Sequence, residues 1–553
     1  MFWVGERVFL PSFMSSRQEK ILLLAILVFS ALLRFGGLNW GDGYFFHPDE
    51  NNMARAILNL SQGNSPGLYA YGQYPLFIAL FSARIYNLFS FVHQQHQLTF
   101  SQAVFFLRFW SALTGVAVVW LVYLLGRNLI EARSGLIAAA TTAFLPGLIQ
   151  ASHFGTTESW LTLFYLTMVY FSFLFYQENK RVYLFSIGLL LGLALATKIS
   201  AAIFIFVPLT AIGLVVKNDK KSIKDNLIGF FLLIIIALIV MLLFSPFLVI
   251  NYQQSLAVLR YEIAIARGSL PIFYTRQFFN TQPFLFQIKK VLPFLLGWPI
   301  LVLAPLAIIS IIKISKRRNK KNYFFSWLIV LLPSLIFFIY QGQLFVKWTR
   351  FMVPILPVFS LLFAQTITSF YKPLQYILIV SSFLPGLFLF DLVYGQPDVR
   401  QQFSSWAKKN LPENSIVLFE ENNVVDLPLG KHSFQTISFN FYRLEEEDFQ
   451  NQLSQLLELS DYLLIPSRRV FANHSSAKFP NTANFYQKLF SEQLGFLELK
   501  KFNPTSRLWL ANLYYAEAEK RAEETWTVFD HPTIRIYQKK KPYSAEEYRQ
   551  ILF

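Results

Sequence analysis

Long runs of apolar residues fill most of residues 1–394 and limit what this chain can fold into. A helix needs about 20 apolar residues to cross a bilayer, where it satisfies its own backbone hydrogen bonds. By this length criterion we predict about eleven membrane-spanning helices. They lie near residues 21–38, 103–125, 134–151, 157–176, 182–197, 199–216, 227–250, 291–312, 323–340, 351–369 and 374–393. The apolar stretch 182–216 yields two spans only if the chain turns at Lys198.

The composition agrees with a membrane protein and excludes several other classes. Hydrophobic residues make up 54% of the 553 residues and charged residues 15%. The formal net charge of +17 could suggest a nucleic-acid partner, but the basic residues gather in short loops between apolar runs. The positive-inside rule predicts them there, so we expect a membrane and no nucleic acid. The absence of cysteine excludes disulfides, thiolate metal sites and a cysteine nucleophile.

The same rule predicts the orientation of the spans. If the N-terminus is cytoplasmic, every second loop is basic. These loops carry Arg127 and Arg133, Lys180 and Arg181, Lys217, Lys220, Lys221 and Lys224, the segment 313–322, and Lys372. The first apolar run lacks a small-residue cleavage site, so we predict a retained span. An odd number of spans then places the loops 39–102 and 251–290, and the chain after Asp391, outside the plasma membrane.

The composition changes after residue 394, where a polar chain of about 160 residues begins, long enough for a separate domain. Helical patterns at 398–410 and 449–460 alternate with strand-like segments at 415–421, 461–467 and 526–540. We therefore predict a membrane domain over residues 1–394 and an extracytoplasmic α/β domain over residues 395–553.

The first outer loop, residues 39–102, is too long for a simple connection. It contains a short helix beginning at HPDE (47–50) and an apolar segment at 74–92 that suits the membrane interface. The adjacent Asp49 and Glu50 have two interpretations. Proline and carboxylates suit the first turn of a helix, so the pair could simply cap it. Alternatively, burial and the neighbouring like charge raise one pKa into the range of a general base.

Charged residues at membrane depth are rare and usually functional. The sequence offers Arg34, Glu158, Lys198 and Arg350, all at the predicted outer ends of spans. Their convergence on one face indicates a site, whereas the alternative is that each side chain separately reaches the lipid head groups.

Histidines give no metal prediction. His153 stands near Glu158, and His93 and His96 form HQQH, but a metal needs three or four ligands at defined geometry. No GxGxxG, P-loop or HExxH motif occurs in the sequence, which argues against a nucleotide bound at the cytoplasmic face.

Several short motifs together resemble a known family. They are RFGGL (34–38), HPDE (47–50), YPLFIAL (74–80), SHFGTTESWLTLF (152–164), LATKISA (195–201), TRFMVPILP (349–357) and, in the polar part, 394–420 and 526–540. Their order is similar to that in membrane glycosyltransferases of the GT-C fold, family 39, which includes protein O-mannosyltransferases and lipid A aminoarabinose transferases. The chain departs from the aminoarabinose transferases at Gln73 and Tyr74 before a single Pro75, and many relatives have Asp where Glu158 stands.

The resemblance implies an inverting transfer of a monosaccharide from a polyprenyl phosphate donor to an extracytoplasmic acceptor, without a cofactor. Asp49 is then the general base and Glu50 its support. Because the phosphate leaves ionised, the reaction needs cations rather than a general acid. We expect Lys198, Arg350 and Arg276 to hold the phosphate. The expected cavity residues are Arg34, His47, Tyr74, His153 and Glu158.

Two other classes are possible. A transporter or flippase of lipid-linked sugars predicts internal repeats and a site near the bilayer midplane, and the sequence shows no repeat. A non-catalytic assembly or sensor protein leaves the long first loop and its carboxylates unexplained. We expect the outer domain to lie over the face that carries Asp49 and to help select the acceptor; a purely stabilising cap is the alternative.

Overall fold

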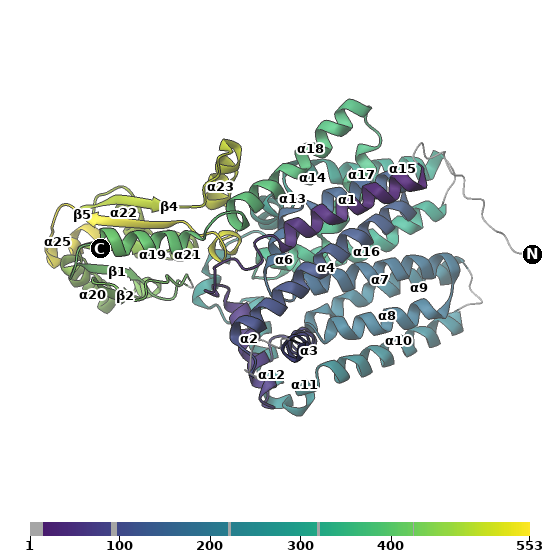
Figure 1. The fold of residues 1–553 in the computed structure, drawn as a ribbon, viewed down its shortest axis with the longest axis horizontal. Helices are drawn as coiled ribbons and strands as arrows, with labels where there is room; N and C mark the ends of the chain where they lie inside the picture. Colours follow the sequence, from purple (N-terminus) through teal and green to yellow (C-terminus); the bar gives the residue numbers. More distant parts are fainter. Residues whose placement is uncertain (1–14, 90–96, 219–222, 318–320, 424) are drawn as a thin grey trace, which may run out of the picture.

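The molecule has two architecturally different ends. The computed structural model describes residues 15–89, 97–218, 223–317, 321–423 and 425–553. A bundle of long helices forms one end and an α/β domain the other (Figure 1). The chain leaves the bundle after η7 (Phe390–Tyr394) and enters the α/β domain with α19 (Val399–Asn410).

The bundle contains both continuous and broken helices. They are α1 (Ser16–Phe35), α4 (Phe100–Leu129), α5 (Ala132–Ala143), α6 (Pro146–His153), α7 (Glu158–Glu178), α8 (Arg181–Leu195), η1 (Ile199–Ile205), α9 (Phe206–Asn218), α10 (Ile223–Phe244), α13 (Leu292–Leu296), α14 (Trp298–Leu303), η5 (Ala304–Leu306), α15 (Ala307–Arg317), α16 (Lys321–Gln343), η6 (Thr349–Ile355), α17 (Leu356–Ile367) and α18 (Lys372–Leu389).

In the described parts of the chain, eight helices are long and apolar enough to cross a membrane, or nine if a bent pair is one span. Helices α1 and α8 pack beside them, so every predicted span corresponds to a helix or a broken helix. The predicted turn at Lys198 is present, because α8 ends at Leu195 and η1 begins at Ile199. Several predicted spans are not continuous, and the predicted span 227–250 ends early because α10 stops at Phe244. Residues 134–151 bend by 55° before Pro146, and residues 291–312 break at Gly297, whose φ is +77°.

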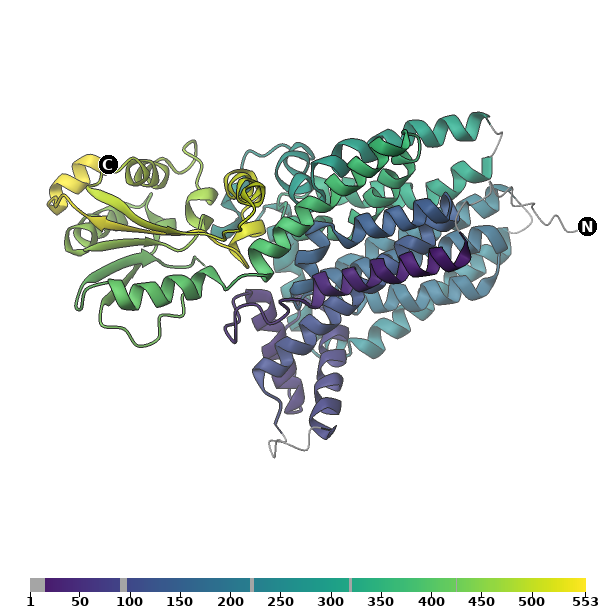
Figure 2. The ribbon, with the colours of Figure 1, turned by 45° about the horizontal axis from the view of Figure 1, so that its top comes forward.

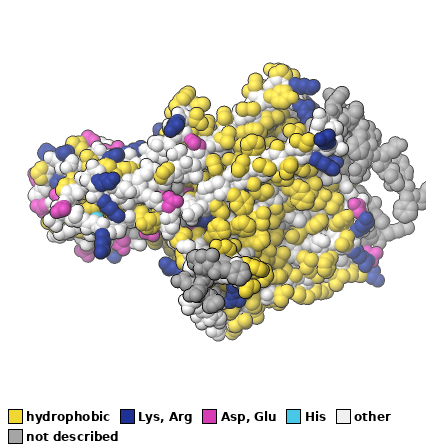
Figure 3. All heavy atoms as spheres, in the orientation of Figure 1, with side chains coloured by type: hydrophobic (Ala, Val, Ile, Leu, Met, Phe, Trp, Pro, Cys, Tyr) yellow, Lys and Arg dark blue, Asp and Glu magenta, His cyan; other side chains and the backbone are white. Residues whose placement is uncertain are grey.

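The surface of the bundle matches a lipid environment. Figure 3 shows hydrophobic side chains over most of its visible face, with Lys and Arg near the end opposite the α/β domain. Helix α10 is the most apolar candidate span, and only 22% of its most apolar window is buried. The chain is therefore a multi-pass membrane protein.

The first long loop folds into two helices at the end of the bundle that faces the α/β domain. Helices α2 (Pro48–Ser61) and α3 (Tyr74–Phe89) run across the direction of the bundle (Figures 1 and 2). Their apolar faces share a core with the start of α4, through residues such as Ile57, Leu76 and Leu107. The loop after α10 lies at the same end and contains α11 (Phe247–Ile250), α12 (Tyr252–Arg267), η3 (Phe273–Phe278) and η4 (Gln287–Val291).

The α/β domain, here called the outer domain after the side of the membrane predicted for it, contains a five-stranded sheet with the order β2-β1-β3-β5-β4. The first three strands of this order are parallel, and β5 is antiparallel to both β3 and β4. The strands are β1 (Ile416–Glu420), β2 (Gln435–Phe439), β3 (Tyr462–Ile465), β4 (Phe496–Phe502) and β5 (Ile534–Lys539). The helices after α19 are η8 (Phe441–Arg443), α20 (Glu447–Leu459), α21 (Arg469–Asn473), α22 (Pro480–Phe490), α23 (Trp509–Arg521), α24 (Thr525–Val528) and α25 (Ala545–Leu552).

Helices cover both faces of this sheet, as Figure 2 shows. Helix α19 packs on one face through Phe403, while α20, α22 and α25 pack on the other. The predicted helices at 398–410 and 449–460 and the predicted strands at 415–421 and 461–467 agree with the structure.

One predicted strand, at residues 526–540, is wrong in its first half. Residues Thr525–Val528 form α24, and β5 begins only at Ile534. Tyr515 of α23 and Trp526 of α24 belong to the same apolar core as the bundle helices, not to the cores of the sheet. This part of the outer domain is therefore packed into the membrane domain.

Candidate active site

The first turn of α2 directs its two carboxylates to different partners. His47 precedes the helix, and its Nδ1 accepts a hydrogen bond from the Glu50 amide at 3.4 Å. Pro48 occupies the first helical position, which needs no amide donor. Because the imidazole supplies the side-chain cap, Asp49 and Glu50 are available for other interactions.

Glu50 is completely buried and is held by Arg108 of α4. The guanidinium donates to both carboxylate oxygens at 2.8 and 2.7 Å, and the Gly155 amide donates to one of them at 2.7 Å. Arg108 also donates to the backbone oxygens of Leu38 and Trp40. Glu50 therefore ties α2 to α4 and to the segment before α7. It fixes the helix that carries Asp49.

Asp49 faces a cluster of charges at the end of the bundle next to the α/β domain. It forms an ion pair with Arg350, the second residue of η6. The two side chains are 20% and 27% exposed, so the pair is open to a small reactant. The guanidinium lies 5.2 Å from the Trp348 ring centroid, and its Nε has no hydrogen-bond partner among the described residues.

A second ion pair lies in the same cluster. Lys198 Nζ is 3.6 Å from the Glu158 carboxylate, and it lies 5.2 Å from the Tyr71 ring centroid. It also lies 5.4 Å from the ring of Phe351, which stands 6.0 Å from the Arg350 guanidinium. Both cations are therefore near the same aromatic side chain.

A glycine allows the loop before α3 to approach Lys198. The Gly72 amide donates to the Thr197 oxygen at 3.0 Å, and the Tyr74 amide donates to the Ala196 oxygen at 3.1 Å. A Cβ at Gly72 would lie 2.0 Å from the Ala196 oxygen, so no other residue fits this contact. The pairing brings Tyr71 beside Lys198.

The pKa of Asp49 is shifted in the direction opposite to the sequence prediction. Burial acts to raise the pKa of Asp49, but the charge of Arg350, aided by His47 and Lys198, lowers it below the ordinary aspartate value. The predicted rise toward a general-base range is therefore wrong for this state. Its physical reason is that Glu50 turns away to Arg108, so the groups facing Asp49 are cations.

The predicted cavity residues separate into two groups. A narrow cavity of ≈ 30 Å³ is lined by His47, Glu158 and Arg350, and also by Thr349, Thr525 and Phe529. Thr525 and Phe529 belong to the outer domain. The His47 ring lies between the rings of Phe154 and Phe529, with centroids 4.5 and 4.6 Å away.

Three other predicted residues lie outside this cavity lining. Arg34 is buried beneath the break between α5 and α6, where it donates to the backbone oxygens of Thr142 and Ala143. His153 stacks on Tyr394 at 3.5 Å, and Tyr74 packs against aromatic rings that include Trp160. Arg34, His153 and Tyr74 therefore have packing roles inside the bundle.

The predicted phosphate ligand Arg276 has a different environment. Its Nη1 donates to the backbone oxygen of Tyr442 at 2.6 Å and lies 2.8 Å from His474 Nε2. Its guanidinium lies 4.6 Å from the Phe479 ring centroid. All three partners belong to the outer domain. The structure thus brings Lys198 and Arg350 together near Asp49 and places Arg276 at the contact between the domains.

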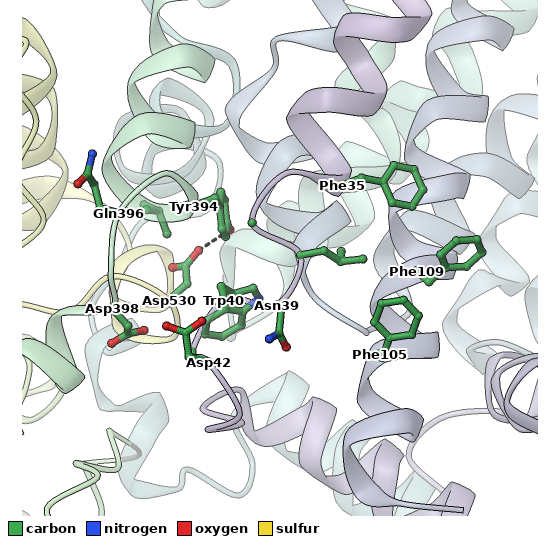
Figure 4. Close-up of a pocket in the computed structure, with 14 residues that line it drawn as sticks. Phe35, Asn39, Trp40, Asp42, Phe105, Phe109, Tyr394, Gln396, Asp398 and Asp530 are labelled. Atoms are coloured by element: carbon green, nitrogen blue, oxygen red, sulfur yellow. Dashed lines mark hydrogen bonds between the residues drawn. The ribbon is translucent and has the colours of Figure 1, made fainter. Parts of the chain in front are cut away.

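A larger pocket of ≈ 560 Å³ lies near the outer ends of α1 and α4. Figure 4 shows Phe35, Phe105 and Phe109 on one side of it and Asp398 and Asp530 on the other, with Trp40 between them. Two of the three acidic side chains in its lining already have partners, because Asp398 pairs with Arg400 and Asp530 accepts hydrogen bonds from Tyr394 and Gln150. No metal-binding group of three or more His, Asp or Glu side chains occurs among the described residues. The HQQH motif, with His93 and His96, lies outside them.

Sequence reasoning missed several residues that shape this site. Arg108 could have been found, because it is a charge inside the predicted span 103–125. Tyr71 gave no comparable signal, since aromatic residues occur throughout the first long loop, and Thr349 stood out only as the first residue of TRFMVPILP.

Comparison with known proteins supports the fold. Residues 79–250 match the family model described as dolichyl-phosphate-mannose-protein mannosyltransferase. The archaeal oligosaccharyltransferase AglB from Archaeoglobus fulgidus, solved with an inhibitory peptide and a dolichol-phosphate, has a TM-score of 0.55 at 14% identity, over 86% of this chain and 73% of that one. ArnT from Cupriavidus metallidurans, solved with undecaprenyl phosphate, has a TM-score of 0.45 at 12% identity, over 94% and 98% of the two chains.

The S. cerevisiae protein O-mannosyltransferase Pmt1-Pmt2 complex, bound to the sugar donor, is 23% identical over 44% of this chain and 35% of its own, with a TM-score of 0.36. Among curated proteins, none matches the sequence. The predicted GT-C fold is confirmed, and the predicted resemblance to glycosyltransferases of family 39 is confirmed over residues 79–250.

The adjacent acids should respond differently to substitution. Glu50→Gln leaves the buried Arg108 without a full charge partner, which should lower the free energy of unfolding by about 3–5 kcal/mol. Asp49→Asn breaks a partly exposed pair and should cost less than about 1 kcal/mol. Thermal unfolding of the two purified variants in the same detergent measures the difference. Equal loss of stability would contradict the assignment of Glu50 to the framework.

Proposed function

We propose that this chain is an inverting glycosyltransferase that moves a monosaccharide from a polyprenyl phosphate donor to an extracytoplasmic acceptor. The observation that carries the proposal is the grouping of Asp49 and Glu158 with Arg350 and Lys198 at one end of an apolar bundle. A carboxylate that takes a proton and cations that hold a phosphate are the groups this transfer requires.

Asp49 acts as the general base. It removes the proton of the acceptor's nucleophilic group as that atom bonds to the anomeric carbon of the sugar. The bond from the same carbon to the phosphate oxygen breaks on the opposite face, and the electron pair leaves with the polyprenyl phosphate. Because its pKa is lowered, Asp49 is ionised and ready to accept a proton at neutral pH.

Arg350 and Lys198 stabilise the departing phosphate. Arg350 pairs with Asp49 through its Nη1, and its Nε is a buried donor without a partner in the described structure. The guanidinium therefore has hydrogen-bonding capacity left for a phosphate that enters the site. Lys198 stands where the bundle surface is apolar, since the next residue, Ile199, is 41% exposed. This position suits a phosphate whose polyprenyl chain remains in the membrane.

The outer domain belongs to the acceptor side of the site. Thr525 and Phe529 line the cavity together with Arg350 and Glu158. An acceptor in this cavity would contact the outer domain beside Arg350, the partner of Asp49, which supports a role in acceptor selection. The alternative function, transport of a lipid-linked sugar, fits less well because the charges gather at one end of the bundle and not at its middle.

Release of polyprenyl phosphate tests the proposed reaction. Purified protein is reconstituted with a panel of polyprenyl phosphate sugars, and free polyprenyl phosphate and the glycosylated product are followed by mass spectrometry. Asp49→Asn should lower the transfer rate by about 10²–10⁴-fold, the contribution typical of a general base. Its binding of polyprenyl phosphate should persist. Transport of the intact donor without cleavage by the wild-type protein would favour the flippase instead.

The pH dependence of transfer should report the Asp49–Arg350 pair. The lowered pKa keeps Asp49 in its basic form, so activity should fall only below the ordinary range of an aspartate. Removing the charge in Arg350→Gln lets burial raise the pKa of Asp49, and the acidic limb of the profile should move to higher pH. Arg276→Gln, a matched loss of a distant guanidinium, should leave the limb in place. An acidic limb at the same pH in the wild type, Arg350→Gln and Arg276→Gln would contradict the influence of Arg350 on the pKa of Asp49.

We also propose that the outer domain and Asp49 lie outside the cytoplasm. The cysteine-free chain allows single labels, so Lys409→Cys in the outer domain should react with a membrane-impermeant maleimide on intact cells. Lys180→Cys, in the loop between α7 and α8, should react only after permeabilisation. The reverse pattern would overturn the orientation.

A further inference from the structure

Residues 523–531, here called the docking segment, connect the outer domain to the membrane domain at two points. Glu523 contacts the start of η6, and Asp530 accepts hydrogen bonds from Gln150 of α6 and from Tyr394. Between these anchors, Thr525 and Phe529 line the cavity. The docking segment therefore forms part of the wall of the proposed active site.

Glu523 binds the backbone directly before Arg350. Its Oε2 accepts from the Thr349 amide at 3.1 Å and from the Thr349 hydroxyl at 2.8 Å. Its Oε1 accepts from Gln277 Nε2 at 2.7 Å and from the Thr525 amide at 3.1 Å. The side chain is fully buried, and these donors occupy both of its oxygens. Such a carboxylate has little freedom to move.

Thr349 begins the helix that carries Arg350 and continues through α17. The first amides of a helix lack partners within it, and their end of the helix dipole favours a negative charge. Trp348, which precedes the helix, supplies no side-chain cap. Glu523 supplies both the acceptor and the charge from another domain.

Contacts from both domains hold Glu523 in place, because Lys290 belongs to η4 of the membrane domain and Arg468 to the outer domain. The Glu523 amide donates to the Lys290 oxygen at 2.9 Å. Arg468, which follows β3, donates to the oxygens of Ala518 and Ala522 at the end of α23. The sheet, α23 and Glu523 thus form a continuous set of contacts that ends at Thr349.

We infer that Glu523 is a positioning residue for Arg350, through which the outer domain sets the place of the phosphate-binding guanidinium beside Asp49. The inference rests on the proposed role of Arg350 in holding the donor phosphate. It makes the outer domain necessary for donor binding, in addition to any selection of the acceptor.

Glu523→Gln tests this role with little change in shape. Both oxygens of Glu523 accept hydrogen bonds, whereas a glutamine side chain replaces one of them with an NH2 donor. Either Thr349 or Gln277 then loses its acceptor. The neighbouring acid offers a matched control, because Glu524 is also fully buried but pairs with Arg469 inside the outer domain, 3.2 Å away. Glu524→Gln therefore changes the adjacent buried carboxyl, whose pKa burial raises to about 7, without touching the Thr349 contact.

The measurement is the affinity of the full chain in nanodiscs for undecaprenyl phosphate, determined by native mass spectrometry. Glu523→Gln should weaken binding by about tenfold, the loss of a charged hydrogen bond, and Glu524→Gln by no more than about twofold. In combination with Arg350→Lys, Glu523→Gln should cause no further loss, because both changes act on one interaction.

Three results separate the outcomes. Unchanged affinity of Glu523→Gln, or losses that multiply in the double variant, would overturn the positioning role alone. Wild-type affinity of Arg350→Lys and Arg350→Ala would overturn the proposed phosphate role of Arg350 and, with it, the inference. If Glu523→Gln does not fold, Thr349→Val removes one donor to the same carboxylate. It should weaken binding by about threefold, whereas Thr349→Ser should bind normally; equal binding by Val and Ser would contradict the inference.

Discussion

The ion pair between Asp49 and Arg350 is the interaction on which the proposed chemistry depends. It joins the helix α2 to η6, 301 residues further along the chain, so it forms only when these distant segments are folded together. The pair keeps the carboxylate ionised in a poorly hydrated place, and it leaves part of the guanidinium free. The same ion pair therefore keeps the proposed base ionised and holds the proposed phosphate-binding guanidinium beside it.

The buried pair of Glu50 and Arg108 fixes the position of the helix from which Asp49 reaches Arg350. Two adjacent acids in one helical turn have different tasks because their side chains leave the helix in different directions. Glu50 is fully desolvated and bound by two donors from α4 and one amide from Gly155. Asp49 is partly exposed and pairs with Arg350, which lines the cavity. A rigid neighbour allows the exposed acid to be reactive without being mobile.

The sequence predicted the membrane bundle well, because hydrophobic length and basic loops follow directly from the energetics of the bilayer. The convergence of Glu158, Lys198 and Arg350 was also predictable, since charges at span ends are rare. Arg34 met the same criterion, and Arg276 was expected from the long loop 251–290 to hold the phosphate, yet the fold turns them toward backbone oxygens and the outer domain. The partners of a side chain depend on packing between distant segments, which spacing does not encode. The strand predicted at 526–540 failed for the same reason, because its first half packs against bundle helices.

The contact of Glu523 with Thr349 connects the outer domain to the proposed phosphate-binding residue Arg350. A domain that only capped the bundle would not need to place a buried carboxylate at the first residue of η6. Binding of the donor and access of the acceptor then depend on one docking segment. The most direct test of the central claim is a structure of the Asp49→Asn protein in nanodiscs with undecaprenyl phosphate. The account predicts phosphate oxygens within hydrogen-bonding distance of both Arg350 and Lys198, with residue 49 facing the open side of the phosphate. A phosphate bound elsewhere, with both cations still paired to protein groups alone, would contradict it.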